Sequence, residues 1–281
     1  MPEEKLKLFS DFYHGFYGVE WSKLFDSLGS DCGKIGRPNL WAKPMPVSCK
    51  IFSHQDPEPP PLSSNSILDF YNMDRASAVV PYFMEISSGQ NVLDMCAAPG
   101  GKSLIIWELM NASGKLVLND ISQSRRFKLK NIINSYIPKQ LQHGIQISGM
   151  DANKFGLRYP NTFDRVLLDA PCSSESHVVR SAKALSNWTP SKTRQLSARQ
   201  FSLICSALSS LKKGGLLCYS TCSISPHEND EVIKKIMKRK KHPCEFVQIK
   251  TTLGTQTEMG RLFLPNRHKM GPIFFSLLRK L

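Results

Sequence analysis

Two short segments place a cysteine beside groups that could carry out covalent chemistry. Asp169-Ala-Pro-Cys172 and Ser220-Thr-Cys222 each follow an apolar run. A thiolate is a strong nucleophile, and a nearby cation or a helix N-terminus can activate it. If it adds to carbon 6 of a cytosine ring, carbon 5 becomes reactive enough to accept a methyl group. An acid such as Asp169 would ease that addition by protonating ring nitrogen 3.

A second interpretation of these cysteines stays open at this point. Free cysteines are usually small, buried hydrophobic residues, and the apolar neighbours of Cys96, Cys205 and Cys218 favour that environment. Cys172 and Cys222 could share it. If these two are reactive instead, the residues alone do not decide which thiol attacks.

A glycine-rich segment, Asp94-Met-Cys-Ala-Ala-Pro-Gly-Gly-Lys102, offers a place for a ligand. Its glycines let the backbone approach a ligand closely, and the start of the following helix presents free N–H groups. The segment contains neither G-x-G-x-x-G nor G-x-x-x-x-G-K-[ST], which argues against a dinucleotide or a nucleoside triphosphate. Asp120 and Asp151 follow the next two apolar runs. The first could accept both ribose hydroxyls of an adenosyl group and the second could lie near its adenine, although either acid could simply cap a helix.

These segments need a scaffold that brings them to one edge. Five apolar runs predict buried strands, at residues 91–95, 115–119, 145–148, 165–168 and 216–219. Three intervening stretches predict helices, at residues 103–110, 122–136 and 193–211. Strands that alternate with helices predict an α/β, Rossmann-like fold, a parallel sheet with helices on both faces. Ligands bind at the carboxyl ends of the strands in such a sheet, where all of these segments lie.

The first 66 residues are predicted to form an N-terminal helical extension that ends in a linker. Aromatic and leucine residues between positions 9 and 28 recur mostly at three- and four-residue spacings, which predicts a helix-rich element interrupted by Gly15 and Gly18. Its aromatic face could stack on RNA bases, but we interpret it as a face that packs on the main domain. The proline- and serine-rich run at 56–66 predicts a linker or extended strap. Residues 67–281 then form the catalytic domain.

The composition limits the partners and the compartment. Thirty-seven Lys and Arg against 23 Asp and Glu give a net charge of +14, which suits a nucleic acid partner, although many basic proteins are simply soluble. No run of about 18 apolar residues occurs, so a membrane span is excluded. The charged N-terminus shows no targeting segment, which predicts a cytoplasmic protein, with a mitochondrial one as the alternative if a leader precedes this sequence. None of the eight cysteines forms a C-x-x-C pair, so we expect no metal site and no disulfide.

Taken together, the segments LDMCAAPGGKS, LDAPCSS and YSTCSISPHENDEVI resemble the Sun-type family of RNA (cytosine-5)-methyltransferases. The resemblance covers about residues 67–281, including the segments at 74–77, 261–265 and 271–275, and is closest to the mitochondrial-type branch of ribosomal and transfer RNA enzymes. It implies a methyltransferase that uses S-adenosyl-L-methionine to form 5-methylcytosine in RNA. Ribosomal RNA, and so a role in rRNA processing, is the first expectation and transfer RNA the alternative.

The resemblance also carries the family's site residues to matching positions. Cys222 would be the nucleophile, Cys172 would assist product release, and Asp169 would aid protonation of the ring. Lys102 would face the cofactor and the active site, although it could be a surface lysine. The implied cofactor positions are Cys96, Ala97, Ala98, Pro99, Gly100, Gly101, Lys102, Asp120, Arg125, Asp151 and Asp169.

Several features leave the substrate and partners open. The segment at 173–177 departs from what many members have after the Pro-Cys motif, and we expect no appended RNA-binding domain of the kind that several relatives carry. Substrate selection could then rest on a basic face or a partner protein, and we expect a monomer. The run at 234–241, with six cations in eight residues, could grip phosphate or be only a solvated helix end. The rival hypotheses are a non-catalytic RNA-binding ribosome assembly factor and methylation of DNA or another base.

Overall fold

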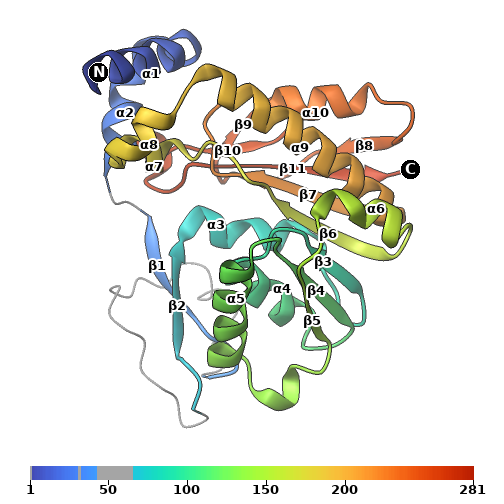
Figure 1. Cartoon of the computed structure of the whole chain (residues 1–281). Coiled ribbons are helices and arrows are strands. Elements are labelled where there is room, and N and C mark those ends of the chain that lie inside the picture. Colours follow the sequence, from blue (N-terminus) through green and yellow to red (C-terminus); the bar gives the residue numbers. More distant parts are fainter. Residues whose placement is uncertain (1, 31–32, 43–65) are drawn as a thin grey trace.

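The five predicted strands form one half of a large sheet (Figure 1). The computed structural model describes residues 2–30, 33–42 and 66–281. Neighbouring strands in the order β5, β4, β3, β6 and β7 run parallel. Their bounds are Asn91–Asp94 (β3), Lys115–Asn119 (β4), Ile145–Ser148 (β5), Phe163–Asp169 (β6) and Leu211–Thr221 (β7). The predicted bounds were right for β4 and β5, while β6 and β7 are longer than their predicted cores.

The other half of the sheet is antiparallel and was not predicted, so the predicted parallel sheet is confirmed for the five strands β3 to β7 and extended by further strands. β11 (Ile273–Lys280) runs antiparallel beside β7 and also pairs with β8 (Cys244–Val247), and β10 (Arg261–Phe263) and β9 (Thr255–Gln256) continue the edge. β10 and β11 are joined through the short helix α11 (Pro265–His268) rather than a long crossover helix, and a short connection produces antiparallel neighbours.

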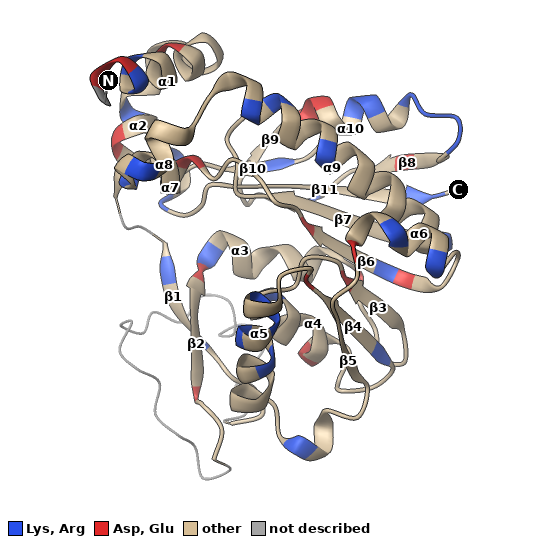
Figure 2. Ribbon diagram, in the orientation of Figure 1, with Lys and Arg blue, Asp and Glu red and all other residues tan. Residues whose placement is uncertain are grey.

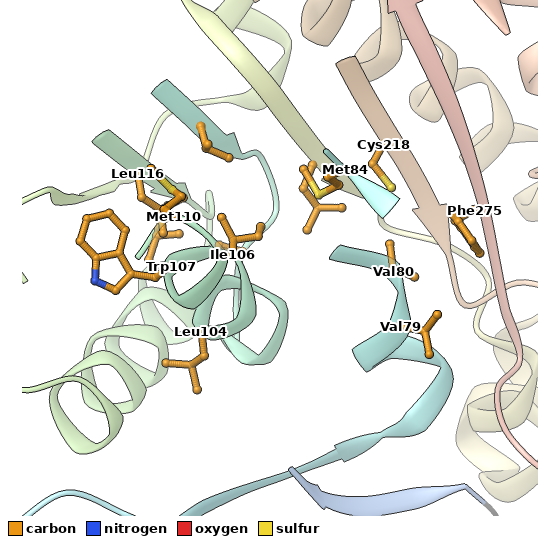
Figure 3. Close-up of a cluster of buried hydrophobic side chains, with 14 of the residues drawn as sticks. Val79, Val80, Met84, Leu104, Ile106, Trp107, Met110, Leu116, Cys218 and Phe275 are labelled. Carbon is orange, nitrogen blue, oxygen red and sulfur yellow. The ribbon is translucent and has the colours of Figure 1, made fainter. Parts of the chain in front are cut away.

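Helices cover both faces of the sheet, as predicted (Figure 1). One buried cluster joins α3, α4 and α5 to the first face, and part of it is drawn in Figure 3. A second cluster joins α6, α9 and α10 to the opposite face. The bounds are Arg75–Val79 (α3), Gly101–Leu109 (α4), Gln123–Tyr136 (α5), Phe155–Arg158 (α6), Pro190–Ser210 (α9) and Asp230–Met237 (α10). α9 begins earlier than predicted because the Thr189 hydroxyl caps its first turn and a proline occupies its first position.

The N-terminal residues form two helices that pack on the main body. α1 (Pro2–Tyr17) and α2 (Trp21–Gly29) are joined by a 3-10 turn that begins at Gly18, where φ is +54°. The predicted interruption at Gly18 is confirmed, whereas the one at Gly15 was wrong, because that residue lies inside α1. The aromatic face is buried against α7 (Glu175–Arg180) and α8 (Ala182–Asn187), which confirms its interpretation as packing.

A small two-stranded sheet follows the N-terminal helices. β1 (Lys34–Pro38) pairs antiparallel with β2 (Phe70–Asp74). Residues 56–65 of the predicted linker lie outside the described residues, and the domain boundary at residue 66 stays a prediction. No helix within the described ranges is both long and apolar enough to cross a bilayer. Because these strands of the large sheet are parallel, the carboxyl ends of β3, β4, β6 and β7 lie at one edge, where the predicted site residues are located.

Candidate active site

The two predicted reactive cysteines lie in contact at the ends of adjacent strands. Cys172 follows β6 and Cys222 follows β7, and their sulfur atoms are 2.8 Å apart. The backbone N–H of Cys222 also donates to the Cys172 sulfur at 3.3 Å. The two strands run parallel and in register up to Asp169 and Ser220, so the loops that follow them emerge side by side. The fold thus brings together the two thiols that the sequence placed at one edge.

The pKa values of the two thiols are shifted in opposite directions. The hydrogen bond from Cys172 lowers the pKa of Cys222 despite its burial, and the cationic Lys102 interacts electrostatically with Cys222. The hydrogen bond to Cys222, burial and two nearby glutamates raise the pKa of Cys172 well above its ordinary value. A lower pKa increases the thiolate fraction. The directions of these two shifts are those of a Cys222 thiolate that accepts a hydrogen bond from Cys172, while the sulfur–sulfur contact by itself allows either sulfur to be the donor.

Asp169 is held by two side chains beside the cysteines. Lys102 Nζ donates to Asp169 Oδ2 at 2.7 Å, and the Ser220 hydroxyl donates to Asp169 Oδ1 at 2.7 Å. Burial disfavours the charged form of Lys102, but the anionic groups around it, Asp169 foremost, raise its pKa above the ordinary value. Lys102 is only 9% exposed. It is therefore a buried cation of the site and not a surface lysine.

A cavity of about 680 Å³ connects these groups. Its walls include Cys172, Cys222, Asp169 and Lys102, and the backbone of Gly271 lies opposite. It is large enough to hold a small planar ring, and pockets for small molecules have volumes of this order. The same cavity is lined by residues that the sequence reasoning did not single out as site residues, namely Lys34, Asn72, Met73, Ser174, Ser176, Arg180, Pro272 and Ile273.

Two smaller cavities adjoin the first, with which each shares Cys96. One, of about 250 Å³, is lined by the glycine-rich loop, Lys102 and Asp169. The loop residues on its wall are Cys96, Ala97, Ala98, Pro99, Gly100 and Gly101. Gly100 has a φ of +126°, and an added Cβ at Gly101 would lie 2.7 Å from the Tyr71 ring. Packing and backbone conformation thus require these glycines, in addition to any approach of a ligand.

The other small cavity, of about 170 Å³, lies at the ends of β4 and β5 and is lined by Asp120, Asp151 and Arg125. Arg125 Nη1 is 2.9 Å from Asp120 Oδ2, and its other terminal nitrogen donates to the Ala98 carbonyl. Arg125 therefore links the end of β4 to the glycine-rich loop. Asp151 caps a short helical turn through the N–H of Asn153, so it does both things that the sequence allowed, capping and facing the cavity.

This set of residues fits an adenosyl ligand. Asp120 is almost buried and its carboxylate lies at a strand end beside a cavity, the position from which an acid accepts ribose hydroxyls in related folds. The cavity beside the glycine-rich loop leads from there toward Asp169 and Lys102. Within the described residues, no group of three or more His, Cys, Asp or Glu side chains could hold a metal ion.

Asp94 is a site residue that the sequence reasoning missed. It ends β3, lines the 250 Å³ cavity, and accepts a hydrogen bond from the Ser103 hydroxyl at 2.8 Å. Burial raises its pKa to about 7. Its position at a strand end is the same signal that identified Asp120 and Asp151, so the signal was present in the sequence.

The basic run at 234–241 lies away from this site. It starts in α10 and ends beside Pro243 and β8, whose first residue pairs with Lys280 at the end of β11 (Figure 2). Lys241 shares a small cavity with Lys280 and Asn161, which precedes β6. The run therefore ends at the amino edge of the parallel strands, opposite the cysteines.

Of the other cysteines, Cys218 is buried as predicted, whereas Cys205 and Cys96 are only partly buried.

Comparisons with known proteins agree with this geometry. Residues 81–279 match the family described as 16S rRNA methyltransferase RsmB/F. The mitochondrial tRNA (cytosine(34)-C(5))-methyltransferase of Danio rerio is 31% identical over 94% of this chain and 79% of its own. The 5-cytosine rRNA methyltransferase NSUN4 of Mus musculus is 30% identical over 90% of this chain and 72% of its own. The crystal structure of PH0851 superposes with a TM-score of 0.81 at 26% identity, over 96% of this chain and 65% of that one.

Proposed function

This chain belongs to the RsmB/F family of 16S rRNA methyltransferases, RNA (cytosine-5)-methyltransferases that use S-adenosyl-L-methionine, and from that membership we propose that it methylates carbon 5 of a cytosine in ribosomal RNA. The observation that carries the proposal is the contact between Cys172 and Cys222 in a cavity shared with Asp169 and Lys102. A nucleophile, a second thiol, an acid and a cation then surround one space large enough for a pyrimidine.

Cys222 is the proposed nucleophile. Its thiolate adds to carbon 6 of the target cytosine, which forms a carbon–sulfur bond and makes carbon 5 electron-rich. Asp169, which accepts hydrogen bonds from Lys102 and Ser220, takes up the proton that Cys222 releases on becoming a thiolate and passes it to ring nitrogen 3 as the negative charge develops. When bound, the cofactor supplies the electrophilic methyl group. Loss of the carbon 5 proton to water, return of the nitrogen 3 proton to Asp169 and breakage of the carbon–sulfur bond then regenerate Cys222, with Cys172 assisting that release. The base must be unpaired or flipped out of its stack to reach the cavity.

The cofactor is assigned to the two smaller cavities. Asp120 would accept the ribose hydroxyls, Asp151 would lie near the adenine, and the loop at 96–101 would hold the methionine part. Arg125 would keep Asp120 and the loop at a fixed separation, because it bonds to both. This arrangement places the adenosyl group at the ends of β4 and β5, where ligands bind in parallel sheets.

The substrate proposal favours ribosomal RNA over transfer RNA. The matching family is described by a ribosomal substrate, and NSUN4 of Mus musculus is named as an rRNA enzyme, whereas the Danio rerio relative is named for position 34 of transfer RNA. Lys34 and Arg180 line the cavity, and we propose that they contact phosphates of the RNA beside the target base. Arg180 also donates to the Leu28 and Ser30 carbonyls. The mitochondrial name of the Danio rerio relative favours a mitochondrial location for this chain over the predicted cytoplasmic one.

The test is to incubate the protein with labelled S-adenosyl-L-methionine and separate pools of ribosomal and transfer RNA, from cytosol and from mitochondria. The RNA is then digested and the labelled nucleoside identified. We expect 5-methylcytidine in the ribosomal pool. Label confined to transfer RNA would show that transfer RNA, and not ribosomal RNA, is the substrate. No label in any pool, despite cofactor binding, would favour a non-catalytic role in ribosome assembly.

A further inference from the structure

Two fully buried carboxyl groups lie next to the cysteine pair. Glu175 begins α7, three residues after Cys172, and Glu228 follows Cys222 in the loop before α10. Both are 0% exposed, and no ion pair found within the described residues joins a lysine or arginine to either. Burying a charge without a partner is costly. The contacts of these two acids therefore need an explanation that the proposed reaction does not supply.

Each acid accepts a backbone hydrogen bond from the other cysteine's loop. The N–H of Ser173, next to Cys172, donates to Glu228 Oε2 at 3.1 Å. The N–H of Ile224, in the Cys222 loop, donates to Glu175 Oε2 at 3.0 Å. The two loops are thus joined reciprocally through their own glutamates. Gln200 of α9 also donates to Glu228 Oε2, at 2.7 Å.

Two serine hydroxyls lie between the acids and reveal a shortage of hydrogen atoms. The Ser173 hydroxyl contacts Oε1 of both Glu175 and Glu228. The Ser223 hydroxyl is 3.1 Å from both, and the two serine oxygens are 3.0 Å apart. Each hydroxyl has one hydrogen to donate, and the Tyr13 hydroxyl gives a third to Glu175 Oε1, so three hydrogens cannot serve all of these contacts. One proton on a carboxyl group removes the repulsion between two anions and supplies a further donor. Consistent with this count, burial and the neighbouring Glu175 raise the pKa of Glu228 to about 7.

The first helix is bonded to the same group. The hydroxyl of Tyr13 donates to Glu175 Oε1 at 2.5 Å, and the hydroxyl of Tyr17 donates to the Ile224 carbonyl at 2.6 Å. Tyr13 is 0% exposed and stacks on Trp21. The N-terminal helices therefore contact the loops that carry the cysteines, although they contribute no side chain to the cavity that contains Cys222.

We propose that Glu175 and Glu228, with one proton held between them, are positioning residues that clamp the Cys172 loop to the Cys222 loop. The catalytic meaning of the clamp rests on the proposed function, since it is the attack by Cys222 that a fixed geometry would serve. Displacing a reacting group by about 1 Å can cost about 100-fold in rate. The clamp is expected to control the position and reactivity of the Cys222 thiol. That reactivity can be measured without RNA.

The experiment compares Glu228→Ala with Glu228→Gln. Glu245→Gln, at an exposed acid on β8 outside both cysteine loops, is the matched control. Three quantities are measured on the full chain: the alkylation rates of Cys222 and Cys172 by iodoacetamide, followed by peptide mass spectrometry; the affinity for S-adenosyl-L-methionine; and kcat and KM on RNA. Glu228→Ala should lower kcat about 100-fold and remove the preference of iodoacetamide for Cys222, with unchanged cofactor affinity. Glu228→Gln should keep both properties near wild type, because its amide can donate the hydrogen that the shared proton supplies.

Several outcomes would overturn the proposal. If Glu228→Ala keeps the wild-type alkylation preference and kcat, there is no clamp. If Glu228→Gln is as impaired as the alanine variant while Glu245→Gln is normal, the proposal of a shared proton is wrong. If Glu228→Ala misfolds and loses cofactor binding, the test rests on Glu228→Gln and Tyr13→Phe. Tyr13→Phe removes only one hydrogen bond to Glu175 and should weaken the preference of iodoacetamide for Cys222. A wild-type protein that methylates no RNA would refute the proposed function, while the alkylation measurements would still judge the clamp.

Discussion

The catalytic end of the site, after β6 and β7, and the cofactor end, after β3, β4 and β5, are held together differently. At the catalytic end, the partly buried Cys172 and Cys222 contact each other, and the buried Lys102 and Ser220 fix Asp169. At the cofactor end, the glycine-rich loop is positioned mainly by its backbone, and its tie to Asp120 runs through Arg125, whose side chain is 51% exposed. Interactions in a buried polar network are interdependent, whereas exposed ion pairs contribute little. Changes at the catalytic end should therefore abolish chemistry, and changes at the cofactor end should weaken binding by degrees.

The largest effect is expected at the nucleophile. Cys222→Ala should lower kcat by at least about 10³-fold, because no other group can form the bond to carbon 6. It should also fail to form a covalent adduct with RNA that contains 5-azacytidine, as judged by a shifted band on a denaturing gel. Cys205→Ser, which removes a partly exposed thiol outside the site, is the matched control and should behave as wild type.

The neighbouring thiol sharpens this prediction. Cys172→Ala should still form the adduct and should accumulate it with ordinary RNA, since its proposed role is in product release. If instead Cys172→Ala abolishes the adduct and Cys222→Ala keeps it, the assignment of the two thiols is reversed.

The next largest effect is expected at Asp169. Asp169→Asn should lower kcat about 10²- to 10³-fold, as expected for loss of an acid that transfers a proton in the transition state. Its affinity for the cofactor should fall much less, even though Asp169 also lines the cavity beside the glycine-rich loop, because its proposed role is to transfer a proton to the base. Initial-rate assays at saturating substrates measure kcat, and isothermal titration calorimetry measures cofactor affinity separately. Equal losses in both would mean that Asp169 belongs to the cofactor end.

The sequence predicted those features of the site that depend on neighbouring residues, and missed those that depend on contacts between distant segments. β4 and β5 were located to the residue because an apolar run marks a buried strand locally. Both cysteines and Asp169 were predicted because each directly follows such a strand. The antiparallel place of β11 depends on which edge the chain returns to, and no local pattern records that. The contacts of Tyr13 with Glu175, and of Glu175 with the Cys222 loop, join distant segments and likewise became visible only in the fold.

A graded effect is expected at the cofactor end. Asp120→Asn should weaken the affinity for S-adenosyl-L-methionine about ten- to a hundredfold, since hydrogen bonds to a charged group contribute about 1.5 to 3 kcal/mol. At saturating cofactor, kcat should be within about threefold of wild type. Asp26→Asn, an exposed acid on α2, serves as the control. A collapse of kcat at saturating cofactor would contradict the proposed difference between the two ends.

The smallest effect is expected from the basic run, which lies at the opposite edge of the sheet from both ends of the site. Replacing Lys238, Lys240 and Lys241 by glutamine should leave KM for a short single-stranded RNA within about twofold, because these cations cannot reach phosphates beside a base held at Cys222. Lys34→Gln, at the wall of the cavity, should raise KM for the same RNA and reduce its salt dependence by about one unit of slope. These variants distinguish binding of the RNA at the cavity from binding at the basic run. If the triple variant weakens binding of a long folded RNA but not of the short one, the run binds distant phosphates of a structured substrate. If it impairs neither, the run is only a solvated helix end, and selection of the RNA rests on the cations around the cavity or on a partner.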